Sequence, residues 1–447
     1  MGLYTGKHVL VMGLGISGRA AAHLLLRQGA KVHGVDRNLA ALEQQQHLIQ
    51  LKQQGLIATL ESEVDRALNY DFIVVSPGIP SEHPLLTQAY EVGLEVIGEI
   101  ELGCRLVKNR IVGITGTNGK TTVTLLITHV LNYCGYKAVA LGNVGVPFCQ
   151  EIETIDPDVI ILLELSSYQL ETLSQEILDV GVILNITPDH LERYPGMEAY
   201  AATKFKMENC LKKKSLLYLE ERILDEYPHL VKHKEVIRSY GYAVQNNLYS
   251  DLKYVYRERV RLFELPKSLQ DRKNHDLENL MAAYGVSSVF EQVKPEKFIE
   301  AFELFKKPSH RIEFVAERQG VAYYDDSKGT NIDAVIRAVE YLEGPIILIA
   351  GGVDKGSPYT PWLRIFKDRV KYICAIGQAA SKIQEQLSCQ FPVTITKDLD
   401  QAVKKAASLA QKGDIVLLSP GCSSFDMFRD YAHRGEVFQK VVRDLGG

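Results

Sequence analysis

The stretch VLVMGLGISGRAAAHLLLRQGAKVHGVD, residues 9–36, decides how the first part of this chain folds. An apolar strand leads into the turn Gly13-Leu14-Gly15-Ile16-Ser17-Gly18, a helical segment follows, and a second strand ends at Asp36. Glycines spaced G-x-G-x-x-G between a strand and a helix, with an acid about 20 residues later, are typical of a Rossmann-type unit that binds a diphosphate. The pattern fits an NAD-dependent dehydrogenase, and it equally fits a protein that holds a nucleotide-linked substrate.

The composition argues against nucleic-acid-binding, secreted and membrane-spanning proteins. The chain has 447 residues, of which 46% are hydrophobic and 24% charged, enough for two to four domains with packed cores. The formal net charge of -4 and the lack of a basic block argue against a nucleic-acid partner. Residues 1–20 do not read as a signal peptide, and no window is long and apolar enough to span a bilayer. The seven cysteines are scattered without a C-x-x-C pair, so we expect a reduced, cytoplasmic protein without membrane insertion.

Alternating strand and helix signals predict three α/β blocks at residues 1–98, 99–307 and 308–447. The strands expected in them are His8–Met12, Lys31–Val35 and Phe72–Ser76, then Arg110–Thr115, Val159–Leu163 and Val180–Ile186, and finally Val321–Tyr324, Ile346–Ala350, Tyr372–Ile376 and Ile415–Ser419. Residues 236–266 alternate in polarity and are rich in Tyr and Val, which predicts a small antiparallel sheet. Elsewhere we expect mostly parallel sheets, whose ligands bind at the carboxyl ends of the strands.

A second glycine loop, GTNGKTT at residues 116–122, follows the strand expected at Arg110–Thr115 and precedes a helical run. Such a loop presents backbone N–H groups to phosphate at the N-terminus of a helix. Lys120 can reach the terminal phosphates, and the Thr121 hydroxyl can bind Mg²⁺. The usual pattern G-x-x-x-x-G-K-[ST] would place glycine at position 114, where this chain has Ile114. The loop is therefore a variant, G-x-x-G-K-T.

Two further strand ends carry candidate metal ligands. Glu164 ends a buried apolar run, and a carboxylate beside a phosphate loop is well placed to hold Mg²⁺. His190 lies just after another strand, and a histidine on the same sheet edge is a second ligand candidate. An exposed glutamate at a strand end or a surface histidine would account for either residue alone. A triphosphate loop, metal carboxylates and two more α/β blocks do not match the plan of a dehydrogenase.

Together the motifs resemble the ATP-dependent Mur ligases of peptidoglycan synthesis, over essentially the whole chain. The motifs are GLGISG (13–18), GITGTNGKTT (113–122), GNVG (142–145), ELSSYQLE (164–171), NITPDHLERY (185–194), AATKFK (201–206), HR (310–311), DDSKGTN (325–331), GGVDKG (351–356) and SPGCSSFDMF (419–428). The loop with Ile114 is the form that this family itself has. The resemblance implies an N-terminal Rossmann-like domain for a UDP-sugar substrate, a central P-loop ATPase domain and a C-terminal Rossmann-like domain that brings the amino acid.

The same resemblance implies roles for individual residues. The UDP substrate would be bound by Gly15, Ile16, Ser17, Asp36, Ser76, Pro77, Gly78 and Asn143. ATP would be bound by Gly116, Thr117, Asn118, Gly119, Lys120, Thr121, Thr122, Asn279, Arg311 and Asp326. One Mg²⁺ would be held by Thr121 and Glu164, and a second by His190 and Lys204. The chain departs from the family pattern at Asp276, where an asparagine is usual, and at Tyr431, where a phenylalanine is common.

Lys204 requires a chemical change before it can bind a cation, because an ammonium group cannot coordinate Mg²⁺. In the family a lysine at this place is carbamylated by CO₂, which converts it into an anionic oxygen ligand. From the residues alone, Lys204 reads as a lysine on a helix surface, and Lys206 is an equal candidate. The fit of AATKFK to the family motif places the carbamate on Lys204.

The incoming amino acid is expected to be D-glutamate, and the DSK form with Lys328 resembles the branch of the family that adds it. Two carboxylates call for cationic and hydroxyl partners, and the resemblance implies Lys328, Thr330, Lys355, Ser424 and Tyr431. The expected reaction joins D-glutamate to UDP-N-acetylmuramoyl-L-alanine with ATP through an acyl phosphate, with catalytic roles for Lys120, His190, Lys204 and Lys355. The general base stays unassigned, and a monomer is expected.

Three alternatives remain at this point. Another ligase of the superfamily, such as folylpolyglutamate synthase, would resemble the chain from the phosphate loop onward but would lack the domain of about 100 residues that precedes it here. An NAD-dependent oxidoreductase would explain only residues 13–18, and a regulatory module without catalysis would not need Lys120, Glu164, His190 and Lys204 together.

Overall fold

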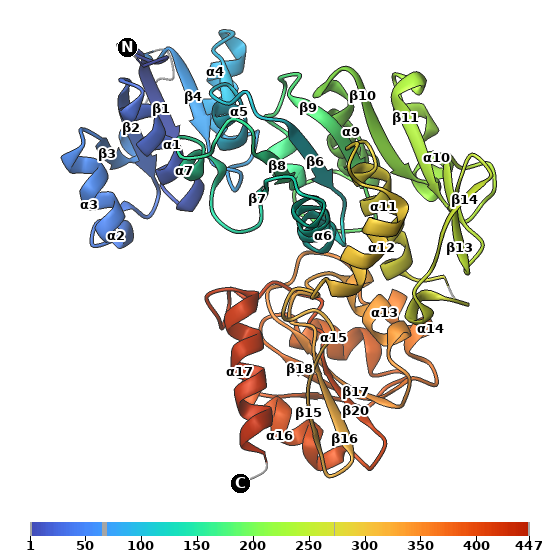
Figure 1. Cartoon of the computed structure of the whole chain (residues 1–447). Coiled ribbons are helices and arrows are strands. Elements are labelled where there is room, and N and C mark those ends of the chain that lie inside the picture. Colours follow the sequence, from blue (N-terminus) through green and yellow to red (C-terminus); the bar gives the residue numbers. More distant parts are fainter. Residues whose placement is uncertain (1, 65–68, 272, 446–447) are drawn as a thin grey trace. The chain divides into compact units, whose positions relative to one another are not determined.

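The computed structural model describes residues 2–64, 69–271 and 273–445, and three β-sheets are found within these ranges (Figure 1). The chain folds into two compact units. The first holds Met1–Asn185 and Ala201–Phe305, and the second holds Ile186–Tyr200 and Lys306–Gly447. The first unit contains two of the sheets and the second contains one. The segment Ile186–Tyr200 therefore belongs with the C-terminal part of the chain, although the sequence places it inside the central block.

The N-terminal sheet has five strands in the order β3-β2-β1-β4-β5, all parallel. Its elements are β1 His8–Met12, α1 Ile16–Arg27, β2 Lys31–Asp36, α2 Leu39–Leu42, α3 Gln46–Gln53, β3 Ile57–Leu60, β4 Phe72–Val75, α4 Pro84–Glu91 and β5 Val96–Gly98, and α5 Glu99–Cys104 follows. Leu10, Met12, Val35 and Ile73 form one buried layer, since alternate residues of a strand face the same side. The reversal of strand order at β1 leaves the first glycine loop at a switch point, where α/β sheets bind ligands.

The central sheet has nine strands in the order β14-β13-β12-β11-β10-β9-β6-β8-β7. Its strands are β6 Ile111–Thr115, β7 Ala138–Gly142, β8 Ile160–Glu164, β9 Leu178–Ile183, β10 Leu211–Glu220, β11 Ile237–Gly241, β12 Leu248–Ser250, β13 Tyr254–Arg257 and β14 Val260–Glu264. The helices are α6 Lys120–Tyr133, α7 Phe148–Glu151, α8 Ser167–Leu170, α9 Met197–Asn209, α10 Glu221–Glu226, α11 His275–Ser287 and α12 Pro295–Leu304. Helices α6, α11 and α12 share one apolar core with this sheet. Strand β6, between β9 and β8, ends at the phosphate loop, which connects it to α6.

The antiparallel pairing expected within 236–266 is confirmed only for β12, β13 and β14. The expectation was wrong for β11, which pairs in parallel with both β10 and β12. The expectation of a separate small sheet was also wrong, because these strands continue the central sheet beyond β10. The parallel pairing of β11 follows from the connection through α10, which brings the chain back so that β11 runs parallel to β10. The next strands then pair along the free edge of β11.

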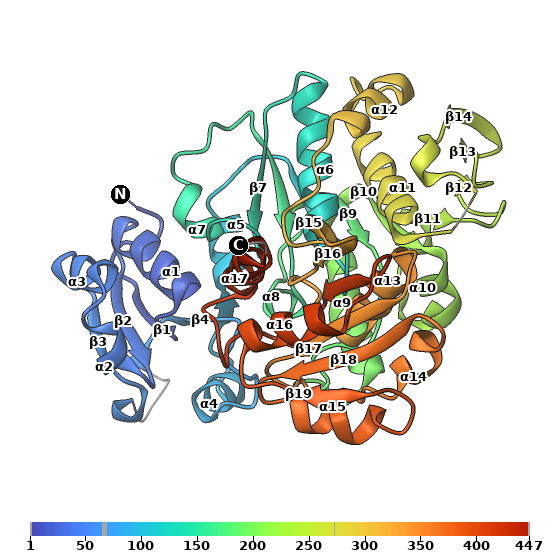
Figure 2. The ribbon, with the colours of Figure 1, turned by 90° about the horizontal axis from the view of Figure 1, so that it is seen from below.

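The C-terminal sheet has six strands in the order β15-β16-β20-β17-β18-β19, and only the β15–β16 pair is antiparallel. Its elements are β15 Glu313–Arg318, β16 Val321–Asp325, α13 Ile332–Tyr341, β17 Ile346–Gly351, α14 Pro361–Phe366, β18 Val370–Ile376, α15 Ala380–Leu387, β19 Val393–Ile395, α16 Leu399–Leu409, β20 Ile415–Leu418 and α17 Tyr431–Asp444. Along β17, Ile346 and Leu348 pack toward α13–α15, whereas Ile347 and Ile349 pack toward α16 and α17. Helices therefore cover both faces, as Figure 2 shows from below.

Candidate active site

The first glycine loop, between β1 and α1, is held by hydrogen bonds on both sides. Ser76 Oγ donates to the carbonyl of Gly13 at 2.9 Å, and the N–H of Leu14 donates to Asp36 Oδ2 at 2.8 Å. Arg19 Nη1 donates to the carbonyl of Leu14 at 2.7 Å. Ser76 and Asp36, both predicted to contact the UDP substrate, thus lie at the loop and fix its backbone.

Gly15 and Gly18 of this loop lie in different surroundings, so the lack of a side chain serves a different purpose at each position. A Cβ at Gly18 would lie 1.8 Å from the carbonyl oxygen of Gly13, so this position needs glycine for packing. A Cβ at Gly15 would meet no atom within 4 Å, and its φ of -63° is open to any residue. Gly15 therefore leaves space over the helix N-terminus that a diphosphate could enter. Ile16, the next residue, is 70% exposed. Of the other predicted UDP contacts, Ser17 and Pro77 are half-buried and Gly78 is exposed.

The phosphate loop, between β6 and α6, is braced by Asn185, which follows β9. The N–H of Thr117 donates to the Asn185 carbonyl at 2.9 Å, and the N–H of Asn118 donates to Asn185 Oδ1 at 2.8 Å. Asn185 Nδ2 donates back to the carbonyl of Asn118 at 3.0 Å. Sequence reasoning had not selected Asn185, although it opens the motif NITPDH. It fixes the loop that Gly116 and Gly119 shape with φ values of 149° and 85°.

Two lysines converge on this loop. Lys120 Nζ donates to the carbonyls of Gly116 at 2.9 Å and Thr117 at 2.8 Å. Lys204, from α9, is only 1% exposed, and its Nζ donates to the same Gly116 carbonyl at 3.0 Å. Lys206 Nζ instead donates to the carbonyl of Glu171 at 2.9 Å. The structure therefore separates the two lysines that the sequence left as competitors, because Lys204 is the one at the phosphate loop.

Glu164 ends β8, next to β6, and is 1% exposed. Its Oε1 accepts a hydrogen bond of 2.7 Å from Asn143 Nδ2, whereas its buried Oε2 has no hydrogen-bond partner among the described residues. A buried carboxylate oxygen left without a partner is costly, and it is the type of ligand that Mg²⁺ takes. Thr121, in the first turn of α6, is also buried, so the donor set fits a magnesium ion. Asn143, predicted to contact the UDP substrate, lies against this candidate ligand.

Asn279 of α11 also reaches the phosphate loop. A Cβ at Gly119 would lie 2.6 Å from Asn279 Oδ1, which brings this predicted ATP contact to the end of the loop. The hydroxyl of Thr122 is buried without a hydrogen-bond partner in the described part of the chain. At the position where the family usually has asparagine, Asp276 is buried and lies 3.4 Å from His275 Nε2.

In the second unit, Asp189 joins three other polar residues. Its Oδ1 accepts from Lys355 Nζ at 3.1 Å and from the N–H of His190 at 3.0 Å. Its Oδ2 accepts from Asn331 Nδ2 at 3.3 Å. Two predicted catalytic residues, His190 and Lys355, thus meet at a carboxylate that sequence reasoning had not selected. The residues predicted to bind Mg²⁺ are divided between the units, with Thr121, Glu164 and Lys204 in the first and His190 in the second.

The predicted amino-acid contacts lie after β16, β17 and β20 and at the start of α17, and a buried arginine of α17 bonds to the loops after β16 and β20. Lys328 Nζ lies 5.0 Å from the ring centre of Tyr431, and Ser327 Oγ donates to the Tyr431 carbonyl at 2.8 Å. Arg434, 1% exposed, donates from Nε to Ser327 Oγ at 3.0 Å and from Nη1 to the Cys422 carbonyl at 3.1 Å. Of the remaining contacts, Ser424 is buried and Thr330 half-buried.

Asp326 is predicted to bind ATP, as is Arg311, whose guanidinium affects the pKa of the Asp326 carboxyl. Asp326 is buried, with Oδ2 accepting from Ser419 Oγ at 2.7 Å and Oδ1 accepting from the N–H of Ile312 at 3.3 Å. Burial raises the pKa of Asp326 to about 7, against the opposing effect of the Arg311 guanidinium. Arg311 Nε is buried without a hydrogen-bond partner among the residues described. An unmatched donor beside a carboxyl group that can gain or lose a proton suits hydroxyl and phosphate ligands.

Comparison with protein families matches three parts of the chain. Residues 7–98 match the Mur ligase MurD-like N-terminal domain, residues 114–287 the Mur ligase middle domain, and residues 310–422 the Mur ligase glutamate ligase domain. A UDP-N-acetylmuramoylalanine–D-glutamate ligase of Protochlamydia amoebophila is 55% identical over 442 residues, which cover 99% of both chains. A ligase of the same name from Caldicellulosiruptor saccharolyticus is 37% identical, over 98% of this chain and 99% of its own.

Solved structures agree in fold. A UDP-N-acetylmuramate–alanine ligase from Thermotoga maritima aligns with a TM-score of 0.60 at 15% identity, over 98% of this chain and all of that chain. A MurF ligase from Thermotoga maritima, solved with ADP, aligns with a TM-score of 0.59 at 16% identity, over 99% of this chain and 97% of that one. At these identities the likeness shows the fold. Among the described residues, no helix combines the length and apolar character needed to cross a bilayer.

Proposed function

The chain belongs to the Mur ligase family, and from this premise we propose that it joins D-glutamate to UDP-N-acetylmuramoyl-L-alanine at the expense of ATP. One observation carries the proposal beyond family membership. Lys120 and Lys204 meet at the Gly116 carbonyl, on the loop that follows β6, while Glu164 ends the neighbouring strand β8. This arrangement supports phosphoryl transfer, which depends on positioned positive charge and metal-binding oxygen atoms.

In the proposed reaction the carboxylate of the UDP-linked substrate attacks the γ-phosphate of ATP, which gives an acyl phosphate and releases ADP. The amine of D-glutamate then attacks the acyl carbon, loses a proton and forms the amide as inorganic phosphate leaves. Lys120 can swing from its two carbonyl partners to the transferring phosphoryl group, whose negative charge it neutralises. Bound Mg²⁺, held by Thr121 and Glu164, would supply further charge neutralisation at the phosphates.

The remaining assignments are part of the same proposal. Gly15, Ile16 and Ser17 bind the UDP diphosphate, with Asp36 and Ser76 holding their loop. Asn279, Arg311 and Asp326 bind the adenosine part of ATP. Lys328, Thr330, Lys355, Ser424 and Tyr431 bind D-glutamate. Lys204 would carry a carbamate derived from CO₂ and, with His190, would serve as a ligand of a second Mg²⁺. We further propose a cytoplasmic monomer.

An assay of phosphate release tests this function. Purified protein is incubated with ATP, Mg²⁺ and UDP-N-acetylmuramoyl-L-alanine, and D-glutamate is compared with L-glutamate, D-aspartate, L-lysine and meso-diaminopimelate. We expect release that depends on the UDP substrate and on D-glutamate. Release with a folate substrate and L-glutamate would instead favour the folylpolyglutamate synthase alternative. Binding of NAD without binding of the UDP substrate would favour the oxidoreductase.

A further inference from the structure

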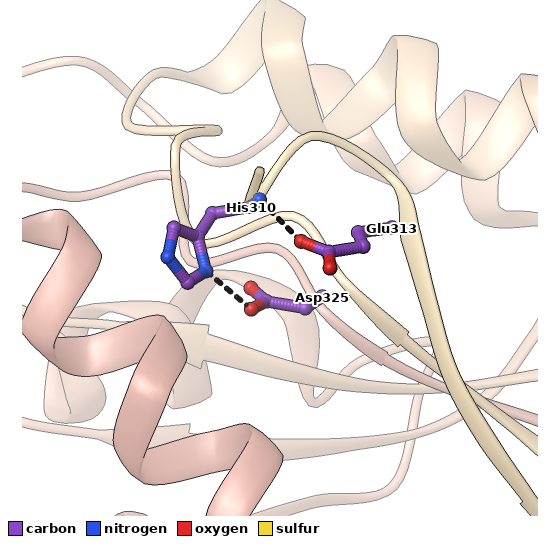
Figure 3. A group of neighbouring side chains, drawn as sticks. All are labelled: His310, Glu313 and Asp325. Atoms are coloured by element: carbon purple, nitrogen blue, oxygen red, sulfur yellow. Dashed lines mark hydrogen bonds and ion pairs between the residues drawn. The ribbon is translucent and has the colours of Figure 1, made fainter. Parts of the chain in front are cut away.

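His310 lies at the start of the second unit, and the mechanism above gives it no role. Three of its hydrogen-bonding groups are engaged by protein partners, of which Glu313 and Asp325 are drawn in Figure 3. Its N–H donates to Glu313 Oε2 at 2.8 Å, its Nδ1 bonds to Asp325 Oδ2 at 2.6 Å, and its carbonyl accepts from the N–H of Lys328 at 3.1 Å. One residue therefore connects the strand β15, the end of β16 and the loop that carries Lys328.

The backbone at His310 is held in an unfavourable conformation. Its φ is 62°, in the left-handed region that residues with a Cβ seldom adopt. Such a conformation persists only where the surroundings determine it, and here α17 packs against the ring. A Cβ at Gly435 would lie 2.1 Å from His310 Nδ1, so the helix has glycine where the imidazole approaches it.

Asp325 is the fixed partner of the imidazole. It is fully buried, and its Oδ1 accepts from the N–H of Ser327 at 2.9 Å. Its Oδ2 also accepts from Gln439 Nε2 of α17 at 2.9 Å. The carboxylate is thus held by three donors and aligns the ring. It also fixes Ser327, the residue directly before Lys328.

The His310–Asp325 pair lies next to Lys328 and Tyr431, two of the residues proposed to bind D-glutamate. The imidazole of His310 and the ring of Tyr431 are 6.5 Å apart, at an interplanar angle of 78°. Lys328 Nζ lies over the same Tyr431 ring, and the Lys328 backbone is bonded to His310. A displacement of His310 would therefore disturb the backbone of Lys328, which bonds to its carbonyl, and the packing beside the Tyr431 ring.

From this geometry we propose that the His310–Asp325 pair is the positioning device that holds Lys328 and Tyr431 in place to bind the carboxylates of D-glutamate. The inference rests on the proposed function. His310 acts through Lys328 and Tyr431 and need not touch the substrate. The strain at its backbone is retained because three separate hydrogen bonds of this residue set the shape of the site.

Because His310 can titrate, the proposal also predicts that the binding of D-glutamate depends on pH. The hydrogen bond to Asp325 raises the pKa of the imidazole, and Glu313 of β15 and Glu436 of α17 act in the same direction. The ion pair is therefore complete below the ordinary histidine pKa and is lost as pH rises through the raised value. Binding of D-glutamate should weaken over the same interval.

The test compares His310→Ala with His310→Asn. Asparagine tolerates a positive φ and places an amide N–H near the position of Nδ1, but it cannot titrate. In His310→Ala we expect the KM for D-glutamate to rise about 10-fold or more, because small displacements of positioning groups are expensive. The KM for the UDP substrate should change less than about 2-fold, and His310→Asn should recover most of the loss. The alkaline rise of the D-glutamate KM should be present in the wild type and absent from His310→Asn.

Gln439→Ala is the matched control, since it removes a donor to the same Asp325 oxygen and leaves the bonds of His310 in place. We expect a much smaller rise of the KM for D-glutamate than in His310→Ala, because two of the three donors to Asp325, His310 and Ser327, stay in place. An unchanged KM in His310→Ala, an equal rise for both substrates, or no recovery in His310→Asn would overturn the proposal. Lys328→Ala separates this inference from the function on which it rests. If its KM is also unchanged, the assignment of Lys328 is wrong; if it is raised while His310→Ala is normal, only the positioning role fails.

Discussion

Lys120 and Lys204 donate hydrogen bonds to the same acceptor, the carbonyl oxygen of Gly116, at 2.9 Å and 3.0 Å. The first lysine belongs to the phosphate loop, and the second comes from α9, 88 residues beyond Gly116 along the chain. Two ammonium groups on one carbonyl concentrate positive charge where the transferred phosphoryl group is proposed to bind. If Lys204 is carbamylated, the same place gains an anionic oxygen beside the remaining cation.

Lys120→Ala should lower kcat by at least about 100-fold, because the lysine is the proposed partner of the transferring phosphoryl group. The fold should persist, since the side chain bonds to carbonyls of its own loop. Steady-state phosphate release and circular dichroism measure the two effects. Lys137→Ala, at an exposed lysine, is the control. A folded Lys120→Ala protein with nearly normal turnover would refute the assignment.

Gly15→Val should raise the KM for the UDP substrate and leave the KM for ATP nearly unchanged. The new side chain occupies the space that the diphosphate needs but meets no protein atom near its Cβ. Gly18→Ala is the contrasting variant, because its Cβ would collide with the Gly13 carbonyl and lower the thermal stability. Calorimetric binding and thermal melts distinguish the two. Normal UDP-substrate binding by Gly15→Val would show that the substrate lies elsewhere.

Glu164→Gln should weaken the binding of Mg²⁺, so that activity requires a higher concentration of the ion. The amide oxygen can still accept from Asn143, but an NH₂ group replaces the Oε2 that has no partner among the described residues. The substitution therefore alters mainly the proposed ligand atom. Titration of activity with Mg²⁺ at saturating ATP measures the change. A wild-type magnesium requirement would exclude Glu164 as a ligand.

Lys204→Ala should lose most activity, and acetate or propionate should restore part of it. A small carboxylate can enter the space left by the buried side chain and supply the missing oxygen to the metal ion. Lys206→Ala is the matched control, since its Nζ bonds to the carbonyl of Glu171, just after α8, rather than to the phosphate loop. Rescue of Lys206→Ala, or full activity of Lys204→Ala without additive, would mean that the modified lysine has been placed wrongly.

Stability should fall as pH rises toward neutrality, and Glu99 should contribute to the fall. Burial raises the pKa of this carboxyl to about 7, although the N–H of Cys149 donates to it at 2.6 Å. A glutamate whose folded pKa lies above its unfolded value of about 4.3 stabilises the fold below that value and loses this effect as pH rises through 7. The full loss is on the order of 4 kcal/mol.

Glu99→Gln keeps the acceptor for Cys149 and removes the titration. Urea unfolding at pH 5.5 and 7.5 should therefore show a smaller drop in stability for the variant than for the wild type. The reverse order, or equal drops, would show that Glu99 is ionised in the folded protein at the lower pH.

The central strands and both glycine loops could be predicted from the sequence, because buried apolar runs bounded by glycine are a strong signal for strands that end in a turn. The prediction failed at strands with weak patterns. β3 and β19 are short and partly exposed at sheet edges, so they lack an apolar run. β10 carries three lysines and a break in register between Leu211 and Leu216, which hides its periodicity.

The candidate site was predicted residue by residue only where a motif existed. Asn185 and Asp189 lay inside a quoted motif but were not selected, because their roles depend on partners distant in sequence. Asn185 meets the phosphate loop, and Asp189 meets Lys355, which is 166 residues away. Single-sequence patterns carry no information about such pairs. The spacing of motifs could likewise not reveal that His190 and Lys355 share one carboxylate.

The segment Ile186–Tyr200 has a consequence for how this protein could be recombined with its relatives. The polypeptide passes from one unit to the other after Asn185, after Tyr200 and after Phe305. A chimera joined at a single point near residue 306 would leave Asp189 from one parent facing Lys355 and Asn331 from the other. The second unit is thus not encoded by one continuous segment. Exchange of the amino-acid specificity proposed for it would require two segments to be transplanted together.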